Sequence, residues 1–181
     1  MRGHLVVGTG IPSHGKSTFT DWYVMNLIND YNMKASWFSP EHSPLELHQS
    51  NFARLFHGKA FFGNDRMTRS DIKDYKDWSN QKIYSTFIEG GQKPTWSWLL
   101  DKFKEQMYSF GVDIFVIDAF NKVLFDKTGN KKDLIDEILT ELTSFAQANN
   151  VIIFLVAHPT KMQKNEEGEY QCPTLYDVRG S

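Results

Sequence analysis

Short apolar runs and amphipathic segments alternate along the chain, and each kind predicts one type of element. Unbroken apolar runs predict buried strands, and apolar positions recurring every three to four residues predict helices. The predicted strands are 5–7, 35–38, 83–88, 112–118 and 151–157. The predicted helices are 17–31, 44–56, a charged surface helix within 66–82, a helix that runs through Leu99 and Phe103 to Gly111, and a helix that carries Ile135 to Ala146.

Strands that are apolar throughout and alternate with amphipathic helices indicate an α/β fold, with a mostly parallel sheet covered by helices on both faces. No internal repeat or low-complexity linker interrupts residues 1–181, so we expect a single domain. In the first helix, Phe19 and Trp22 belong to a broad apolar surface, and we expect Asp21 on the solvent side. The polar segment 121–132 and the tail after His158 are expected to be loops.

The stretch from Gly10 to Thr18 reads GIPSHGKST and directly follows the first predicted strand. The pattern G-x-x-x-x-G-K-S is typical of loops that bind phosphate: the glycines allow a tight turn that points N–H groups inward, and the lysine adds positive charge. A plain turn is the alternative, but the strand before it and the helix after it favour a nucleotide site. The expected contacts are Gly10, Ile11, Pro12, Ser13, His14, Gly15, Lys16, Ser17 and Thr18.

Polar residues follow three other predicted strands, where a parallel sheet places its ligands. Asp118 ends the strand 112–118 and, with the Ser17 hydroxyl, is expected to hold Mg²⁺. Glu41 can orient or deprotonate the attacking water, although an acid after Ser39-Pro40 also suits a helix start. His158 can donate a hydrogen bond to a γ-phosphate, although a histidine after a buried strand is often structural.

Composition narrows the class of protein further. The chain has 181 residues, a net charge of −2 and one cysteine, Cys172, so it has no basic coat for nucleic acid, no internal disulfide and no multi-cysteine zinc site. No signal peptide is recognisable, and the apolar run 151–157 is too short to span a bilayer. We therefore expect a cytoplasmic protein with no membrane partner.

Five motifs in order resemble DnaB-like replicative helicases, closest to the Twinkle and phage primase-helicase branch of the RecA-like P-loop superfamily. They are GIPSHGKST, FSPE, FVIDAFN, VAHPTK and DVRGS, and they extend over essentially the whole chain. The resemblance implies ATP or another NTP with Mg²⁺, with Lys16 at phosphate, Ser17 and Asp118 at the cation, Glu41 as the catalytic carboxylate and His158 as the γ-phosphate sensor. It is compatible with a phage-encoded protein in a host cytoplasm and with a mitochondrial protein.

The resemblance also implies a homo-hexameric ring that moves along single-stranded DNA. The candidate DNA-facing loops follow Asp118 and His158; ordinary solvated loops are the alternative. Their lysines are Lys122, Lys127, Lys131 and Lys132 in the first, and Lys161 and Lys164 in the second, where Glu166, Glu167 and Glu169 dilute the charge. No residue can be assigned as an arginine finger, and Arg179 in DVRGS holds a different position. We expect a core truncated at its C-terminal end, which binds nucleotide with weak turnover and does not unwind duplex.

Three other functions remain open from the sequence. A RecA- or KaiC-like ATPase would keep the fold without unwinding DNA, and a non-hydrolysing module would only bind nucleotide. A small-molecule kinase also uses a phosphate loop, but kinases often carry an arginine-rich lid. The arginines here are Arg2, Arg54, Arg66, Arg69 and Arg179, which form no such cluster.

Overall fold

The computed structural model describes residues 2–11, 13–40, 42 and 45–159. Five strands form one sheet in the order β1-β5-β4-β2-β3, and every pair of neighbours is parallel. The strands are β1 (His4–Thr9), β2 (Ala35–Phe38), β3 (Ile83–Ser85), β4 (Ile114–Asp118) and β5 (Ile152–Ala157). The helices are α1 (Lys16–Tyr31), α2 (Leu45–His57), α3 (Arg69–Ser79), α4 (Trp96–Phe110), the short 3-10 turn η1 (Phe120–Lys122) and α5 (Lys131–Asn149).

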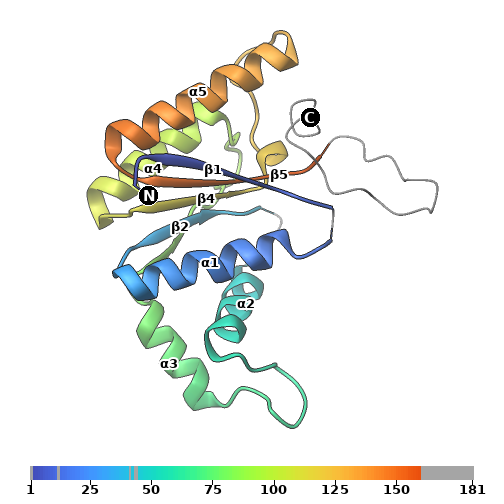
Figure 1. Ribbon diagram of the computed structural model, residues 1–181, viewed down its shortest axis with the longest axis vertical. Coiled ribbons are helices and arrows are strands. Elements are labelled where there is room, and N and C mark those ends of the chain that lie inside the picture. Colours follow the sequence, from blue (N-terminus) through green and yellow to red (C-terminus); the bar gives the residue numbers. More distant parts are fainter. Residues whose placement is uncertain (1, 12, 41, 43–44, 160–181) are drawn as a thin grey trace, which may run out of the picture.

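Helices cover both faces of this sheet, as the sequence predicts. In Figure 1, α4 and α5 lie on one face, while α1, with α2 and α3 beyond it, lies on the other. Side chains along β4 alternate between the two layers, because successive residues of a strand point to opposite faces. Phe115 packs toward α4 and α5 with its ring 4.2 Å from that of Phe103, whereas Val116 belongs to the core with α1 and α2. The fold is therefore a three-layer α/β arrangement.

Local signals in the sequence explain where several helices begin and end. Thr68 and Asp71 form a capping box at the start of α3: Thr68 Oγ1 accepts from the Asp71 N–H, and Asp71 accepts from the Thr68 N–H. Gly111 ends α4 with φ = 70°, and Asn150 ends α5 with φ = 54°. Both residue types favour the left-handed conformation that stops a helix.

Three expectations about burial are wrong. Asp21, expected at the surface, is 4% exposed, because it lies three, four and seven residues before buried Val24, Met25 and Ile28 and so shares their helical face. Phe19 and Trp22, expected to contribute to the core, are 63% and 49% exposed. The strand β1 is partly exposed, because among the described residues it pairs with β5 alone.

Several predicted boundaries also change: β1 runs over His4–Thr9 rather than 5–7, and β4 begins at Ile114 rather than at residue 112. The strand β3 ends at Ser85 rather than at residue 88. The Thr86 N–H still donates to the Trp37 carbonyl oxygen at 2.8 Å, but Phe87 and Ile88 leave the sheet and are exposed. The predicted loop 121–132 includes the last two residues of η1 at its start and the first two residues of α5 at its end. Asn130 caps α5 by accepting from the Lys132 N–H, so helix formation starts earlier than the polar composition suggests.

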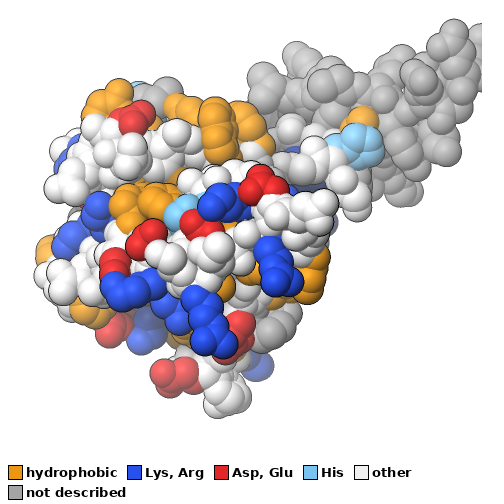
Figure 2. Space-filling view, turned by 90° about the horizontal axis from the view of Figure 1, so that it is seen from below, with side chains coloured by type: hydrophobic (Ala, Val, Ile, Leu, Met, Phe, Trp, Pro, Cys, Tyr) orange, Lys and Arg blue, Asp and Glu red, His pale blue; other side chains and the backbone are white. Residues whose placement is uncertain are grey.

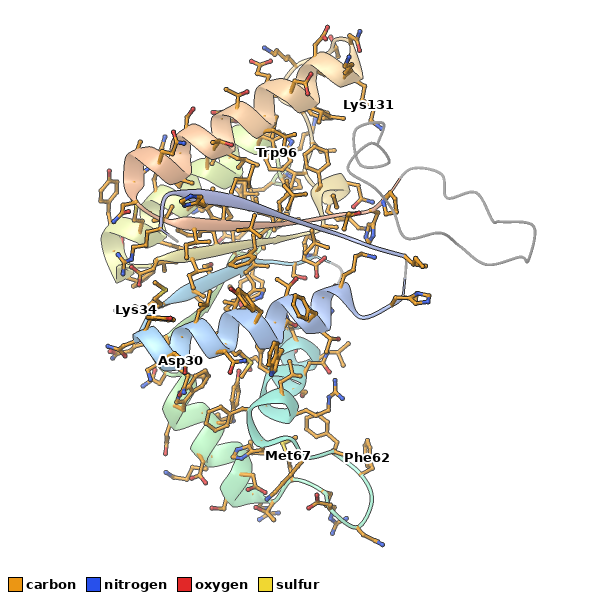
Figure 3. All side chains as sticks on the ribbon, viewed as in Figure 1. Asp30, Lys34, Phe62, Met67, Trp96 and Lys131 are labelled. Atoms are coloured by element: carbon orange, nitrogen blue, oxygen red, sulfur yellow. The ribbon has the colours of Figure 1, made fainter. Side chains whose placement is uncertain are left out.

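The surface carries mixed charge. In the view of Figure 2, Lys and Arg side chains lie beside Asp and Glu side chains. Phe62, labelled in Figure 3, projects from the segment between α2 and α3 and is 89% exposed. Among the described residues, none of the helices combines the length and the hydropathy that crossing a bilayer requires.

Candidate nucleotide-binding site

The residues that follow the strands line one edge of the sheet in a fixed order. Thr9 of β1 is in register with Ala157 of β5, and Asp118 of β4 is in register with Val156. The loop after β1, His158 after β5 and Asp118 at the end of β4 therefore succeed one another along this edge. Ser39 follows β2, the next strand. Parallel pairing thus brings together four of the segments in which the sequence predicts chemistry.

The glycine-rich loop after β1 turns into α1 through a left-handed residue. Gly15 has φ = 79° and directly precedes the helix, and its carbonyl oxygen accepts a 2.8 Å hydrogen bond from the Phe19 N–H. Ser13 is also left-handed, with φ = 63°. Glycine adopts this conformation without the strain that a Cβ brings, and it has no side chain to cap the first helical turn. The first turn of α1 therefore follows the loop directly, at the helix end whose N–H groups bind anions in phosphate sites.

Lys16, the first residue of α1, folds back over the same loop. Its ammonium group donates two hydrogen bonds of 3.0 Å, to the carbonyl oxygens of Gly10 and Ile11. A Cβ on Gly10 would lie 3.4 Å from the aliphatic carbons of the Lys16 side chain. The absence of a side chain at Gly10 therefore leaves space for the Lys16 side chain to pack over the loop. Positive charge is thereby held over the mouth of the loop. Pro12, one of the predicted contacts, lies outside the described residues.

Asp118 is buried at the end of β4, with 3% of its surface exposed. Its carboxylate oxygen Oδ2 lies 3.9 Å from Nδ1 of His42. His158 follows β5 and is partly buried. Glu41, the predicted catalytic carboxylate, lies outside the described residues, between Pro40 and His42. Of the four predicted chemical groups, the structure therefore describes Lys16, Asp118 and His158 and does not describe Glu41.

The chemistry of these groups suits a magnesium nucleotide. Mg²⁺ prefers oxygen donors, and in nucleotide enzymes it takes one or two protein ligands together with phosphate oxygens. The Ser17 hydroxyl and the Asp118 carboxylate are such donors. Within the described part of the chain, no group of three or more His, Cys, Asp or Glu side chains gathers to hold a metal ion by itself. A cation at this edge would depend on the phosphates of the nucleotide.

A buried polar cluster beside this edge escapes sequence reasoning. The Asp21 carboxylate accepts hydrogen bonds from Trp37 Nε1 at 2.9 Å and from His48 Nε2 at 3.2 Å. The His48 ring stacks on that of His42, with centroids 4.5 Å apart and planes 17° apart, and His42 Nδ1 is hydrogen-bonded to Ser39 Oγ at 2.7 Å. The one available signal is that Asp21 shares a helical face with apolar residues, which predicts a buried carboxylate.

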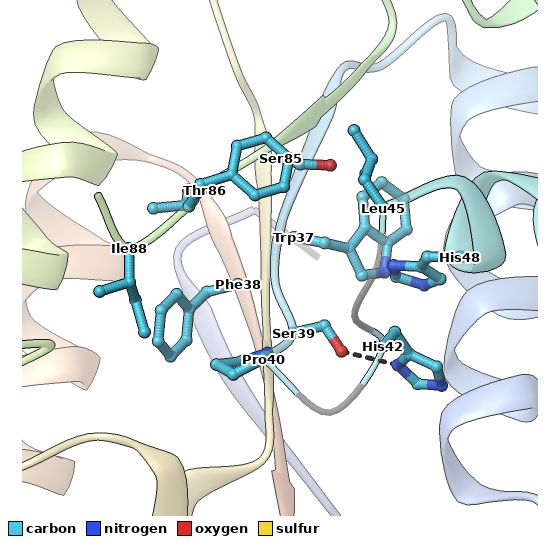
Figure 4. Close-up of a pocket in the computed structure, with 11 residues that line it drawn as sticks. Trp37, Phe38, Ser39, Pro40, His42, Leu45, His48, Ser85, Thr86 and Ile88 are labelled. Carbon is cyan, nitrogen blue, oxygen red and sulfur yellow. Dashed lines mark hydrogen bonds between the residues drawn. The ribbon is translucent and has the colours of Figure 1, made fainter. Parts of the chain in front are cut away.

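This cluster forms one wall of a pocket of about 260 Å³ at the carboxyl ends of β2 and β3. Figure 4 shows His42 and His48 on the side of α2, with Phe38 and Ile88 across the pocket from them. The dashed line in Figure 4 marks the bond between Ser39 and His42. The pocket therefore lies on the β2 side of Asp118, away from the phosphate loop.

The candidate DNA-facing lysines lie in different settings. Lys122 ends η1, while Lys131 and Lys132 belong to the first turn of α5 and not to a loop. Figure 3 places Lys131 at the start of that helix. Lys127 pairs with Glu137 at 2.7 Å, which neutralises part of its charge. Lys161 and Lys164, with Arg179 and the closing DVRGS, lie outside the described residues.

The all-parallel sheet with helices on both faces is that of a RecA-like α/β domain, and similarity to helicases supports its place among the P-loop NTPases. The chain is 29% identical over 187 aligned positions to the "Twinkle homolog protein, chloroplastic/mitochondrial" of Arabidopsis thaliana. This alignment covers 99% of this chain and 26% of the Arabidopsis protein. It is also 29% identical over 103 positions to the DNA helicase/primase of Enterobacteria phage T3. That alignment covers 55% of this chain and 17% of the phage protein. No family model matches.

These similarities support the resemblance to the Twinkle and phage branch of the DnaB-like helicases. The chain spans about a quarter of the length of the Arabidopsis protein, and the match to the phage protein extends over about a sixth of that protein. What is shared is therefore a helicase-like domain.

Proposed function

We propose that this chain is the nucleotide-binding motor core of a DnaB-like replicative helicase, which hydrolyses ATP or another NTP and moves along single-stranded DNA. The observation that carries the proposal is the order of groups along one sheet edge: the loop with Lys16 after β1, His158 after β5 and Asp118 at the end of β4. A phosphate loop at one end and a carboxylate two strands away suit a nucleoside triphosphate with its cation.

Each residue has a separate role in this proposal. Lys16 would exchange its two carbonyl partners for the β- and γ-phosphates, beside the N–H groups of residues 13–18. Ser17 and Asp118 would hold Mg²⁺, which when bound offsets the charge of the phosphates. Glu41 would orient or deprotonate the attacking water, and His158 would donate a hydrogen bond to the γ-phosphate.

The DNA-facing role is assigned to the segments that follow Asp118 and His158, around the centre of a homo-hexameric ring. Lys122, in η1, is the described lysine that lies closest in sequence to Asp118. Because Lys127 is paired with Glu137, we assign it a smaller share of the phosphate contacts. The chain by itself would bind nucleotide and turn it over slowly, because a cationic finger is worth about 10³–10⁵ in rate in phosphoryl transfer and no residue can be assigned to it.

The test is hydrolysis of ATP with and without single-stranded DNA, by this chain and by a version extended beyond Ser181, with Lys16→Ala as the inactive control. The proposal expects DNA-accelerated hydrolysis by the extended version and slow hydrolysis by the chain alone. If neither version responds to DNA while both hydrolyse ATP, a RecA- or KaiC-like ATPase replaces the helicase. If both bind ATP without turnover, the chain is a nucleotide-binding module.

A further inference from the structure

The buried carboxylate of Asp21 anchors the cluster that reaches the edge of the sheet. It is 4% exposed, and two N–H donors from different elements, Trp37 in β2 and His48 in α2, converge on it. A buried carboxylate is costly unless such donors compensate it, so these two bonds fix the His48 ring relative to β2. Because a carboxylate only accepts hydrogen bonds, the tautomer of His48 that makes this bond carries its proton on Nε2.

The fixed His48 ring in turn fixes His42. The two rings are stacked 4.5 Å apart, and a hydrogen bond of 2.7 Å ties His42 Nδ1 to Ser39. The same nitrogen lies 3.9 Å from Asp118 Oδ2. This separation is longer than a hydrogen bond, and Nδ1 has a single hydrogen-bonding position, which Ser39 occupies, so contact with Asp118 requires Nδ1 to exchange the Ser39 hydroxyl for the carboxylate. The stack on the ring face therefore sets where the imidazole lies, with Nδ1 within 4 Å of both Ser39 Oγ and Asp118 Oδ2.

We propose that His42 is a positioning residue for Asp118: in the nucleotide complex its Nδ1, on a ring held by the stack on His48 and by Asp21 behind it, exchanges the Ser39 hydroxyl for the Asp118 carboxylate and orients that carboxylate toward the cation. This inference rests on the proposed nucleotide site and assigns that site a part which the phosphate-loop motif does not contain. The partners that orient a metal-binding carboxylate or imidazole typically change metal affinity by about 10–100-fold when removed.

The amide side chains allow a sharp test, because they imitate different nitrogens of the imidazole ring. The side-chain amide of asparagine reaches about as far as Nδ1, and that of glutamine about as far as Nε2. His42→Asn should therefore retain the contact with Asp118, whereas His42→Gln and His42→Ala should lose it. The matched control is His4→Ala, since His4 is exposed at the opposite end of β1.

The measurement is the dissociation constant of a fluorescent ATP analogue for the 181-residue chain, in Mg²⁺ and in EDTA, together with the thermal unfolding midpoint of each variant. For the wild type we expect tighter binding in Mg²⁺. For His42→Ala and His42→Gln we expect that gain to fall by about tenfold or more, with binding in EDTA unchanged. His42→Asn and His4→Ala should retain the gain in affinity that Mg²⁺ brings. His48→Phe, which keeps a ring under His42 but gives up the bond to Asp21, should lose part of it.

Two results would overturn the inference. One is a Mg²⁺ gain in His42→Ala equal to that of the wild type. The other is an equal loss in the Asn, Gln and Ala variants, which would show that ring packing and not Nδ1 matters. The unfolding midpoints separate these results from simple misfolding. If the wild type binds no nucleotide at all, the proposed function fails and this inference falls with it; if the wild type binds with a Mg²⁺ gain, the variants test His42 alone.

Discussion

The ammonium group of Lys16 donates a 3.0 Å hydrogen bond to the carbonyl oxygen of Gly10, six residues earlier in the same loop. The lysine thus closes over the loop that a nucleotide would enter, and it donates a further hydrogen bond to the Ile11 carbonyl oxygen. Both acceptors are backbone oxygens near the surface, where water can replace the lysine. Phosphate oxygens are stronger acceptors for an ammonium group than neutral carbonyls, so a nucleotide can displace them.

Lys16→Met should therefore leave the fold nearly intact. The substitution removes two partly buried hydrogen bonds whose acceptors can be hydrated, so we expect a loss of about 1 kcal/mol or less in the free energy of unfolding. Urea titration followed by circular dichroism measures this loss. A fall of several kcal/mol would mean that the lysine is part of the core of the structure and not of a binding loop.

Gly15→Ala should destabilise the protein by about 1 kcal/mol, because a residue with a Cβ pays that cost in the left-handed region. No heavy atom lies within 4 Å of the added Cβ, so backbone strain and not a clash is the cause. The matched control is Gly90→Ala, whose Cβ also meets open space and whose φ is not left-handed. Equal stability of the two variants in urea would contradict the loop geometry described above.

The stability of the region between α2 and α3 should depend on pH through Asp71. The Thr68 N–H, the Lys59 ammonium group and the Thr68 hydroxyl hold the pKa of that carboxyl well below its usual range. A lowered pKa in the folded state stabilises the protein above the unfolded pKa of about 3.9, and this stabilisation is lost as the pH falls toward the folded pKa.

Asp71→Asn should accordingly lower the unfolding midpoint by a constant amount above about pH 5, and the difference from the wild type should shrink as the pH falls below about 4. Thermal unfolding by circular dichroism across this range measures it. Asp74→Asn is the control, because Asp74 is exposed on the same helix. A difference that grew on acidification would have the wrong sign for this mechanism.

Much of the fold is predictable from the sequence because its strands are apolar runs that the sheet buries on both faces. Ala35 to Phe38 are all buried, and the predicted bounds of that strand are those of β2. Ile114 to Asp118 are likewise all buried, although the predicted strand began two residues too early, at 112, and the pattern in α5 correctly places Ile138 and Leu142 in the core. These elements follow from short-range periodicity, which a single sequence carries.

The remaining features depend on tertiary contacts that no local pattern carries. β3 stops after Ser85 because Phe87 and Ile88 leave the sheet for the surface, although both are apolar. Asp21 shares a helical face with buried apolar residues, but the donors that compensate its burial, Trp37 and His48, lie 16 and 27 residues later. At the candidate site, the order of the loop, His158 and Asp118 along one edge follows from parallel pairing. The stacking of His48 on His42 does not, because it depends on where α2 packs.

The most direct measurement is the equilibrium binding of Mg²⁺-ATP to the 181-residue chain by isothermal titration calorimetry, for the wild type, Lys16→Met and Lys34→Met. Lys34 is the matched control, since its ammonium group also bonds a backbone carbonyl, that of Phe110 at 2.8 Å, at the opposite end of the sheet. If the edge that carries Lys16 is the nucleotide site, the wild type and Lys34→Met bind alike and Lys16→Met binds at least about tenfold more weakly, as the loss of a charge-assisted hydrogen bond predicts. Absence of binding by the wild type, or equal binding by all three proteins, would contradict a nucleotide site in this loop.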